Sequence, residues 1–226
     1  MNDIARFLPL SNAGRASTGI PETKVTTSWS TEIATILEQV ADLLDGLTPE
    51  QWESPSMCDG WTVRDVAGHI VWRIGSSTGT MLRTGFRAYW GHHINPMKAI
   101  DDLSVKAAQA SYEDLVDRIR EIADDKRSSR GRVRIGELIE AVVHAYDISH
   151  ALKADLALDP RATGAVAVAR VVMAPTPIRA VLRARTLTAT DAGWTLGSGT
   201  PLSGTASTLI MFLFGRKARP TLGTPN

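Results

Sequence analysis

Residues 135–152 read IGELIEAVVHAYDISHAL, and this stretch has the clearest helical pattern in the chain. Apolar residues recur in it at three- and four-residue spacing: Leu138, Val142, Ala145, Ile148 and Leu152. Such spacing places them on one face of an α-helix, because a helix completes a turn in about 3.6 residues. The sequence therefore predicts a helix over 135–152 with one face turned toward a protein core.

Two polar residues share the inward face of this helix. Glu140 and His144 stand four residues apart, so the helix projects both side chains in the same direction, one turn apart. Burying a carboxylate or an imidazole without a partner is unfavourable. A divalent metal would satisfy both groups, as in bundles that build metal sites from facing helices. The alternative is a hydrogen-bonded core histidine, the commoner reason for a histidine on an apolar face.

A second stretch of helical periodicity begins at Ser30. Its apolar residues form one stripe: Ile33, Ile36, Leu37, Val40, Leu43 and Leu44. The sequence Leu47-Thr48-Pro49 is expected to end this helix, because the proline disfavours a helical conformation in the residue before it. A surface helix of a bundle has such a stripe on the side that packs against its neighbours.

A third helix is expected from Val63 to about Ser76. Thr62, with Asp65 three residues later, is typical of the capping box that opens a helix. His69 lies in this helix among apolar residues and is the natural third ligand for the Glu140 and His144 pair. Two imidazoles and one carboxylate facing an open position are typical of a catalytic zinc site, or of a site for another borderline metal.

The fold class expected is mainly α. One more helix is plausible from Ala99 or from Ser111 to Ala123, so the first two thirds of the chain hold the helices of an antiparallel four-helix bundle. We place this bundle at residues 28–153. Residues 1–27, which are polar and lack sustained periodicity, form an N-terminal extension, and residues 154–226 form a short α+β region.

The C-terminal region has a different character. A helix is expected over Ala162 to Met173, followed by two short strands at Thr186 to Thr190 and Trp194 to Leu196. The segment Thr205 to Phe214 predicts a short buried helix that ends at a glycine.

Composition excludes several classes of function. The formal net charge of +1 gives no general attraction for nucleic acid or for an anionic membrane. The longest apolar run, from Leu209 to Phe214, is far shorter than the roughly 20 residues that a spanning helix needs. The N-terminus has no signal-peptide pattern, and the single cysteine, Cys58, fits a reducing compartment. We therefore expect a cytoplasmic protein.

Several motifs resemble one known family. The stretches LTPEQW (47–52) and CDGWTVRDVAGH (58–69) are similar to the N-terminal domain of the mycothiol-dependent maleylpyruvate isomerase family, within the DinB-like metalloprotein superfamily. The stretch ELIEAVVHAYDI (137–148) resembles the second signature of that family. Residues near the end of the chain resemble the C-terminal segment of the family: Thr190-Asp191, Trp194, Gly197, Ser203-Gly204 and the apolar run into Gly215-Arg216. The resemblance covers roughly residues 30 to 216.

The resemblance implies a fold, a metal site and a cofactor. It implies a DinB-like four-helix bundle with a divalent metal, zinc in the first place, held by His69, Glu140 and His144. It also implies mycothiol as a thiol cosubstrate. An arginine near the end of family members handles the acidic substrate, and Arg216 is the matching candidate for a catalytic residue. The alternative for Arg216 is a cap on the last helix. The region after His150 looks shorter than the α/β domain of the isomerase.

Other polar residues have competing interpretations. His150 follows His144 by six residues and is expected to point away from the site. Glu137 shares the inward face and could bond a metal ligand, but we expect a solvated carboxylate in the first helical turn. His92 and His93 lie in an irregular segment, where solvated loop histidines are expected rather than an acid–base pair at a pocket mouth.

Two further features could serve a ligand. Cys58 could be a nucleophile, but no neighbouring residue in the sequence indicates a thiolate, so a packing role is expected. The basic run could attract an anionic thiol or acid, although a solvated connector is the expectation. This run contains Arg127, Arg130, Arg132 and Arg134.

Three functional hypotheses follow. The first is a metal-dependent enzyme in which a thiol such as mycothiol adds to a small electrophilic acid, leading to isomerisation or S-transfer. The second is a metal-dependent hydrolase that uses water and no thiol. The third is a non-catalytic bundle in which the metal stabilises the fold. A homodimer is compatible with each of them.

Overall fold

The computed structural model describes residues 28–77, 79–80, 83, 96–174, 179 and 182–216. The predicted extension over residues 1–27 and the histidines His92 and His93 lie outside this range. The chain divides into two compact units, one spanning Trp29–Leu156 and the other including the described residues from 157 to 216. Each unit is described by itself.

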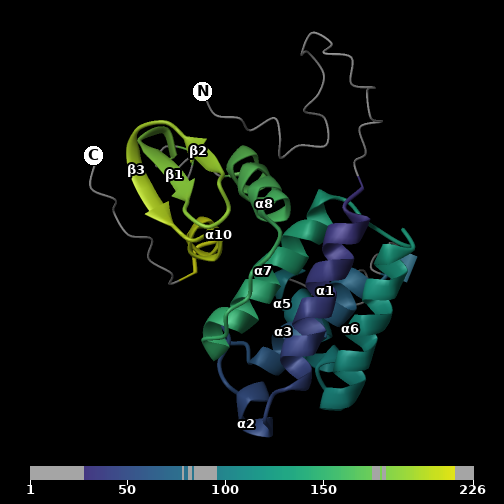
Figure 1. Ribbon diagram of the computed structural model, residues 1–226. Helices are drawn as coiled ribbons and strands as arrows, with labels where there is room; N and C mark the ends of the chain where they lie inside the picture. Colours follow the sequence, from purple (N-terminus) through teal and green to yellow (C-terminus); the bar gives the residue numbers. More distant parts are fainter. Residues whose placement is uncertain are drawn as a thin grey trace. The chain divides into compact units, whose positions relative to one another are not determined.

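The first unit is the expected four-helix bundle. Its long helices are α1 (Ser30–Asp45), α3 (Val63–Gly75), α6 (Tyr112–Arg127) and α7 (Ile135–Leu152), which lie side by side in Figure 1. Helix α1 packs on α6 and α7, and α3 packs on α6 and α7. The predicted apolar stripes of α1 and α7 are buried almost completely, so they form the bundle core.

Ion pairs and hydrogen bonds show the directions of these helices. Arg120 on α6 pairs with Asp45 near the end of α1, with 2.9 Å between Nη2 and Oδ2. Arg127, about two helical turns further along α6, pairs with Glu38, which lies earlier in α1. Helices α1 and α6 are therefore antiparallel. The backbone N–H of Trp29 donates to the carbonyl oxygen of Val133 at 2.7 Å, so α1 and α7 begin next to each other.

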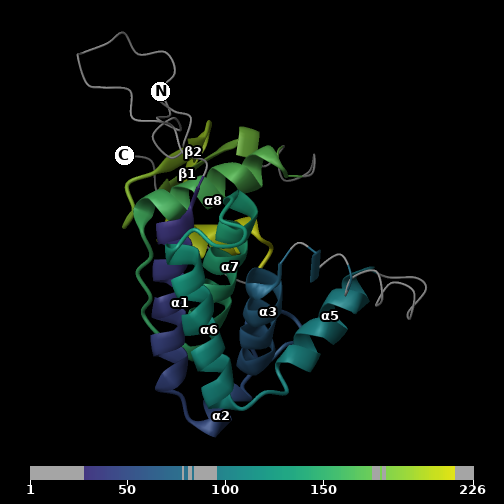
Figure 2. The same cartoon turned by 90° about the vertical axis from the view of Figure 1, so that its right-hand side faces the viewer.

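The helix predicted from Ala99 or Ser111 to Ala123 is in fact two helices. Helix α5 (Pro96–Ala107) and α6 are separated by a break at 108–111, so both proposed starting points for this segment open a helix of their own. Ser111 caps α6, since its hydroxyl accepts a hydrogen bond from the Asp114 N–H at 3.1 Å. Figure 2 shows α5 beside α3 and inclined to the bundle. The structure also has a short helix that the sequence did not predict, α2 (Pro49–Trp52), with a capping box at Thr48.

Arg64 ties the start of α3 to its neighbours. Its Nε donates to the carbonyl oxygen of Ala108 at 2.6 Å, and Nη2 donates to that of Ala110 at 2.9 Å. Thr62 and Asp65 form the predicted capping box at the same helix end. These contacts fix α3, and with it His69, against the segment that follows α5.

The second unit is the small α+β region. Helix α8 (Pro160–Val172) is followed by strands β1 (Arg185–Ala189), β2 (Thr195–Gly197) and β3 (Thr200–Gly204), and by helix α10 (Ala206–Leu213). Strand β1 lies in the middle of the sheet, antiparallel to β2 and parallel to β3. The sequence did not predict β3, because a proline within a short run argues against a strand; as an edge strand, β3 tolerates it.

Buried polar contacts join the elements of this second unit. The indole N–H of Trp194 donates to the hydroxyl of Thr163 on α8 at 3.1 Å. Asp191 accepts a hydrogen bond from the backbone N–H of Ala206 at 2.7 Å, at the start of α10. Among the described residues, no helix is both long enough and apolar enough to cross a membrane.

A test of the bundle packing is available at Gly68, next to His69. A Cβ atom there would lie 2.5 Å from the backbone nitrogen of Ala108, so α3 and the end of α5 can approach closely only because the position has no side chain. We expect Gly68→Ala to lower the free energy of unfolding by about 1–3 kcal/mol, measured by urea denaturation. In Gly136→Ala the new Cβ meets no atom within 4 Å. This control should be neutral or slightly stabilising, and equal effects of the two substitutions would contradict the packing argument.

Candidate metal centre

The three predicted ligands meet between α3 and α7. His69 comes from α3, while Glu140 and His144 come from successive turns of α7. One potential ligand atom from each residue lies within 4.8 Å of the other two. Both histidines are buried, and Glu140 is partly exposed.

The distances between these atoms are long for hydrogen bonds between charged groups, and they also fit a shared metal ion. The Oε2 atom of Glu140 is 3.4 Å from Nε2 of His69 and 3.3 Å from Nε2 of His144. A hydrogen bond between charged partners is about 2.7–2.9 Å long. By contrast, the edge of a tetrahedron around a zinc ion with bonds of about 2.0–2.1 Å measures about 3.4 Å. The donor set and its spacing therefore suit a tetrahedral divalent cation.

The other nitrogen of each imidazole is held by a buried partner. Nδ1 of His69 lies 2.9 Å from the hydroxyl oxygen of Ser104 on α5, and Nδ1 of His144 lies 3.0 Å from a carboxylate oxygen of Asp147 on α7. Asp147 and Ser104 are both fully buried. Such contacts fix the tautomer and the ring orientation, so that Nε2 of each ring is directed at the shared position.

The same contacts set the pKa values of the ligands. Burial would lower the pKa of His144, but its hydrogen bonds with Asp147 and Glu140 outweigh burial and raise the pKa to about 9. Burial lowers the pKa of His69 below its ordinary value, partly opposed by Glu140. Burial would raise the pKa of Glu140, but the two histidines hold it well below its usual range. The directions of these shifts favour a protonated His144 beside the Glu140 carboxylate, and a cation that binds through Nε2 of His144 would have to displace that proton.

A cluster of buried and partly buried charges extends from Glu140. Its second oxygen, Oε1, lies 3.1 Å from Nε of Arg73, and Arg73 also approaches Glu137, with 3.7 Å between Nη1 and Oε1. Arg132 pairs with the same Glu137 oxygen at 3.3 Å. Lys126 is buried too, and burial lowers its pKa while the charge of Glu137 raises it. Each buried charge thus has an opposite charge near it, as burial requires.

Two predictions about polar residues need correction here. Glu137 is not a solvated first-turn carboxylate, because only 7% of its side chain is exposed and it pairs with Arg73 and Arg132. The basic run is not uniformly solvated either. Arg132 is partly buried and donates to the backbone oxygen of Arg73 at 2.6 Å, whereas Arg130 is exposed and pairs with Asp125.

The loop before α3 brings aromatic and sulfur-containing side chains to the site. The ring of Trp61 lies 5.1 Å from that of His69 and 6.5 Å from that of His144, measured between centroids. Cys58 is half-buried, and its sulfur lies within 4.8 Å of potential ligand atoms of His144 and Asp147. Because Asp147 is already bonded to His144, this second group is an extension of the first site.

Two further candidates, His150 and Arg216, belong to neither potential metal-binding group of the described residues. The ring of His150 lies 6.2 Å from that of Tyr146. Arg216 belongs to the second unit, where its backbone N–H donates to the carbonyl oxygen of Met211 at 2.9 Å. Its predicted catalytic role stays a prediction.

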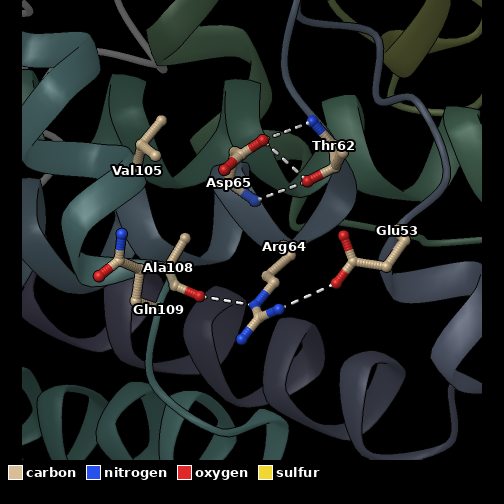
Figure 3. A pocket seen from close by; sticks show the side chains of 7 residues that line it. All are labelled: Glu53, Thr62, Arg64, Asp65, Val105, Ala108 and Gln109. Carbon is tan, nitrogen blue, oxygen red and sulfur yellow. Dashed lines mark hydrogen bonds and ion pairs between the residues drawn. The ribbon is translucent and has the colours of Figure 1, made fainter.

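A surface pocket of about 260 Å³ lies at the start of α3 (Figure 3). It is lined by Glu53, Thr62, Arg64, Asp65, Val105, Ala108 and Gln109. Figure 3 shows that Arg64 is engaged with Glu53 and Ala108, while Thr62 and Asp65 bond each other. None of the three ligands lines this pocket, and its hydrogen bonds hold α3 in place.

The sequence pattern did not predict the contacts that four residues make at the site: Arg73, Ser104, Arg132 (expected only as part of the basic run) and Asp147. Two of them carried a helical signal, since Asp147 follows His144 by three residues and Arg73 follows His69 by four, which places each beside its ligand. No spacing in the sequence connects Ser104 or Arg132 with the ligands, because Ser104 comes from a separate helix, α5, and Arg132 comes from the loop before α7.

The fold and the site together define a class: a helical bundle with a candidate metal-binding cluster of two histidines and one glutamate. A family described as the mycothiol maleylpyruvate isomerase N-terminal domain matches residues 33–149, which is more than half of the chain. The chain belongs to this family. No curated protein sequence matches it.

Two solved structures share the fold at low sequence identity. A crystal structure of the mycothiol-dependent maleylpyruvate isomerase is 10% identical, with a TM-score of 0.51, and the match covers 87% of this chain and 93% of the isomerase chain. A structure of a histidine-to-alanine mutant of that enzyme gives 11% identity and a TM-score of 0.50 over the same shares. The sequence had suggested that the C-terminal region is shorter than the corresponding part of the isomerase. Because the match covers 93% of the isomerase chain, the region is not markedly shorter.

The contact between Asp147 and His144 predicts an effect on metal affinity. Asp147→Asn keeps the size of the side chain but removes the charge that orients the imidazole, so we expect metal binding to weaken by about tenfold to a hundredfold. Competition with a chelating dye measures this constant. Asp155→Asn, which makes the same change at an exposed position, should bind like the parent. Equal affinity of all three proteins would show that Asp147 does not orient the ligand.

The raised pKa of His144 predicts a pH dependence of stability in the metal-free protein. The folded protein holds this proton more tightly than the unfolded chain, so the contribution is complete below the ordinary value of 6.5 and is lost as the pH rises through about 9. We expect the Tm, measured with a chelator present, to fall over this window. The fall should be smaller in His144→Gln. The pKa of His69 is shifted in the opposite direction, so its protonation affects stability at pH values below this window. A parent Tm that stays constant through the window would contradict this assignment.

Proposed function

We propose that this protein is a metal-dependent enzyme that uses a low-molecular-weight thiol, mycothiol or a close relative, to act on a small electrophilic acid. The observation that carries the proposal is the spacing of Nε2 of His69, Oε2 of Glu140 and Nε2 of His144, which suits a tetrahedral cation. Membership of the mycothiol maleylpyruvate isomerase N-terminal domain family supports the thiol.

Different residues at the site would hold the cation, orient its ligands and surround it. His69, Glu140 and His144 would hold the cation, zinc in the first place, and leave one position open. When bound, the cation supplies a Lewis acid that stabilises a thiolate at neutral pH. Ser104 and Asp147 keep the two imidazoles in orientation. The rings of Trp61 and Trp72 lie close to His69, at centroid distances of 5.1 and 6.0 Å, and would shield this imidazole from one side.

The overall charge around the ligands favours an anionic partner. Three cationic side chains, Arg73, Arg132 and Lys126, lie near Glu137 and Glu140, and Asp147 adds a third carboxylate beside His144. Once a cation takes up the charge of Glu140, the surroundings carry an excess of positive charge. Thiolates and carboxylates are stabilised by such a field, which supports an acid as the substrate class.

A thiol panel tests the proposal directly. Purified protein loaded with zinc is incubated with mycothiol, with other small thiols and without thiol, together with unsaturated acids such as maleylpyruvate, and products are followed by NMR. We expect turnover that requires a thiol and is lost by at least a hundredfold in His144→Ala, because a ligand has been removed. Metal analysis of both proteins shows whether the loss of turnover is accompanied by loss of the bound metal.

Other results would redirect the assignment. Hydrolysis of an amide substrate at full rate without thiol would favour a metal-dependent hydrolase. A protein that binds one metal but turns over no substrate with any thiol would sink the thiol proposal. If His144→Ala also lost its folded structure, the metal would be better explained as a structural element of the bundle.

A further inference from the structure

The two oxygens of Glu140 have different partners. Oε2 faces Nε2 of both His69 and His144, at 3.4 and 3.3 Å. Oε1 is turned to Arg73, whose Nε lies 3.1 Å away. A carboxylate can bind a metal through one oxygen or through both. Here one oxygen points to the cation position and the other is engaged by a guanidinium.

Arg73 is itself held in place. It follows His69 by one helical turn on α3, so the helix that supplies one ligand also supplies the group that contacts another. Its guanidinium reaches Glu137 at 3.7 Å, and its backbone oxygen accepts a hydrogen bond from Arg132 at 2.6 Å. Because Glu137 is buried and needs cationic partners, turning Arg73 away from this cluster would be unfavourable.

We propose that Arg73 is a positioning residue that reserves Oε1 of Glu140, so that Glu140 binds the metal through Oε2 alone and a coordination position stays open for a thiolate. This inference rests on the proposed function. If Oε1 were released, it could join the metal and fill the position that the thiol needs. Catalytic metal sites depend on such an open position, whereas structural sites have none.

Cobalt-loaded protein provides the test, because the visible spectrum of Co²⁺ reports its coordination number and a bound sulfur adds a charge-transfer band. The variants are Arg73→Met, which removes the guanidinium, and Arg73→Lys, which keeps a charge that can reach Oε1. Arg118→Met is the matched control, since Arg118 is exposed and pairs with Glu121 on α6. The probe thiol is 2-mercaptoethanol, titrated into each cobalt protein.

With one cobalt per chain retained, Arg73→Met should show visible bands of lower intensity, as expected for an added ligand. Its thiol affinity should be at least about tenfold weaker than that of the parent. Arg73→Lys should fall between the two, and Arg118→Met should match the parent. If Arg73→Met fails to fold, the double variant Arg73→Met with Glu137→Gln, which also removes the carboxylate left with fewer partners, gives the same readouts.

Two results would overturn the inference while the proposed function stands. The first is an unchanged spectrum and thiol affinity in Arg73→Met. The second is complete loss of cobalt from a folded Arg73→Met, which would show that Arg73 is needed for metal retention rather than for selecting one oxygen. A parent protein that binds no cobalt would overturn the proposed function and this inference together.

Discussion

The packing of α3 against α7 is the contact on which the rest of this protein depends. It brings an imidazole from one helix against a carboxylate and an imidazole from the other, in a largely buried interface. Polar groups are unfavourable there unless each has a partner. Ser104 and Asp147 supply partners for the two imidazoles, and Arg73 supplies one for the carboxylate. The close approach of α5 at Gly68 is part of the same requirement, because it brings Ser104 to His69.

The charges around the ligands form one connected system. Arg73 links Glu140 to Glu137, and Glu137 links Arg73 to Arg132. Replacing any member leaves a buried charge with fewer partners, which is more unfavourable than replacing an exposed ion pair. The ion pairs between α6 and α1 are exposed and contribute little by comparison. The buried network therefore determines how the ligands are held, while the apolar stripes of the helices determine the stability of the bundle.

The likeness to the solved isomerase extends over most of both chains, although only 10% of the aligned residues are identical. A helical bundle keeps its fold at such low identity because its core needs apolar residues of suitable volume rather than particular ones. A metal centre has stricter requirements, since only a few side chains donate suitable atoms. In this chain His69, Glu140 and His144 are placed at a spacing that suits the role, and all three lie within the bundle unit.

The sequence alone determined the main helices and the three candidate ligands. The apolar periodicity of α1 and α7, the capping box of α3 and the i, i+4 pair of Glu140 and His144 are local patterns, and local patterns can be read without knowing the fold. Only the tertiary structure decided the surroundings of the site. Arg73, Ser104, Arg132 and the burial of Glu137 depend on which elements meet in space, and strand β3 depends on an edge position that tolerates its proline. These features arise from contacts between segments distant in the chain, which leave no periodic signal in the sequence.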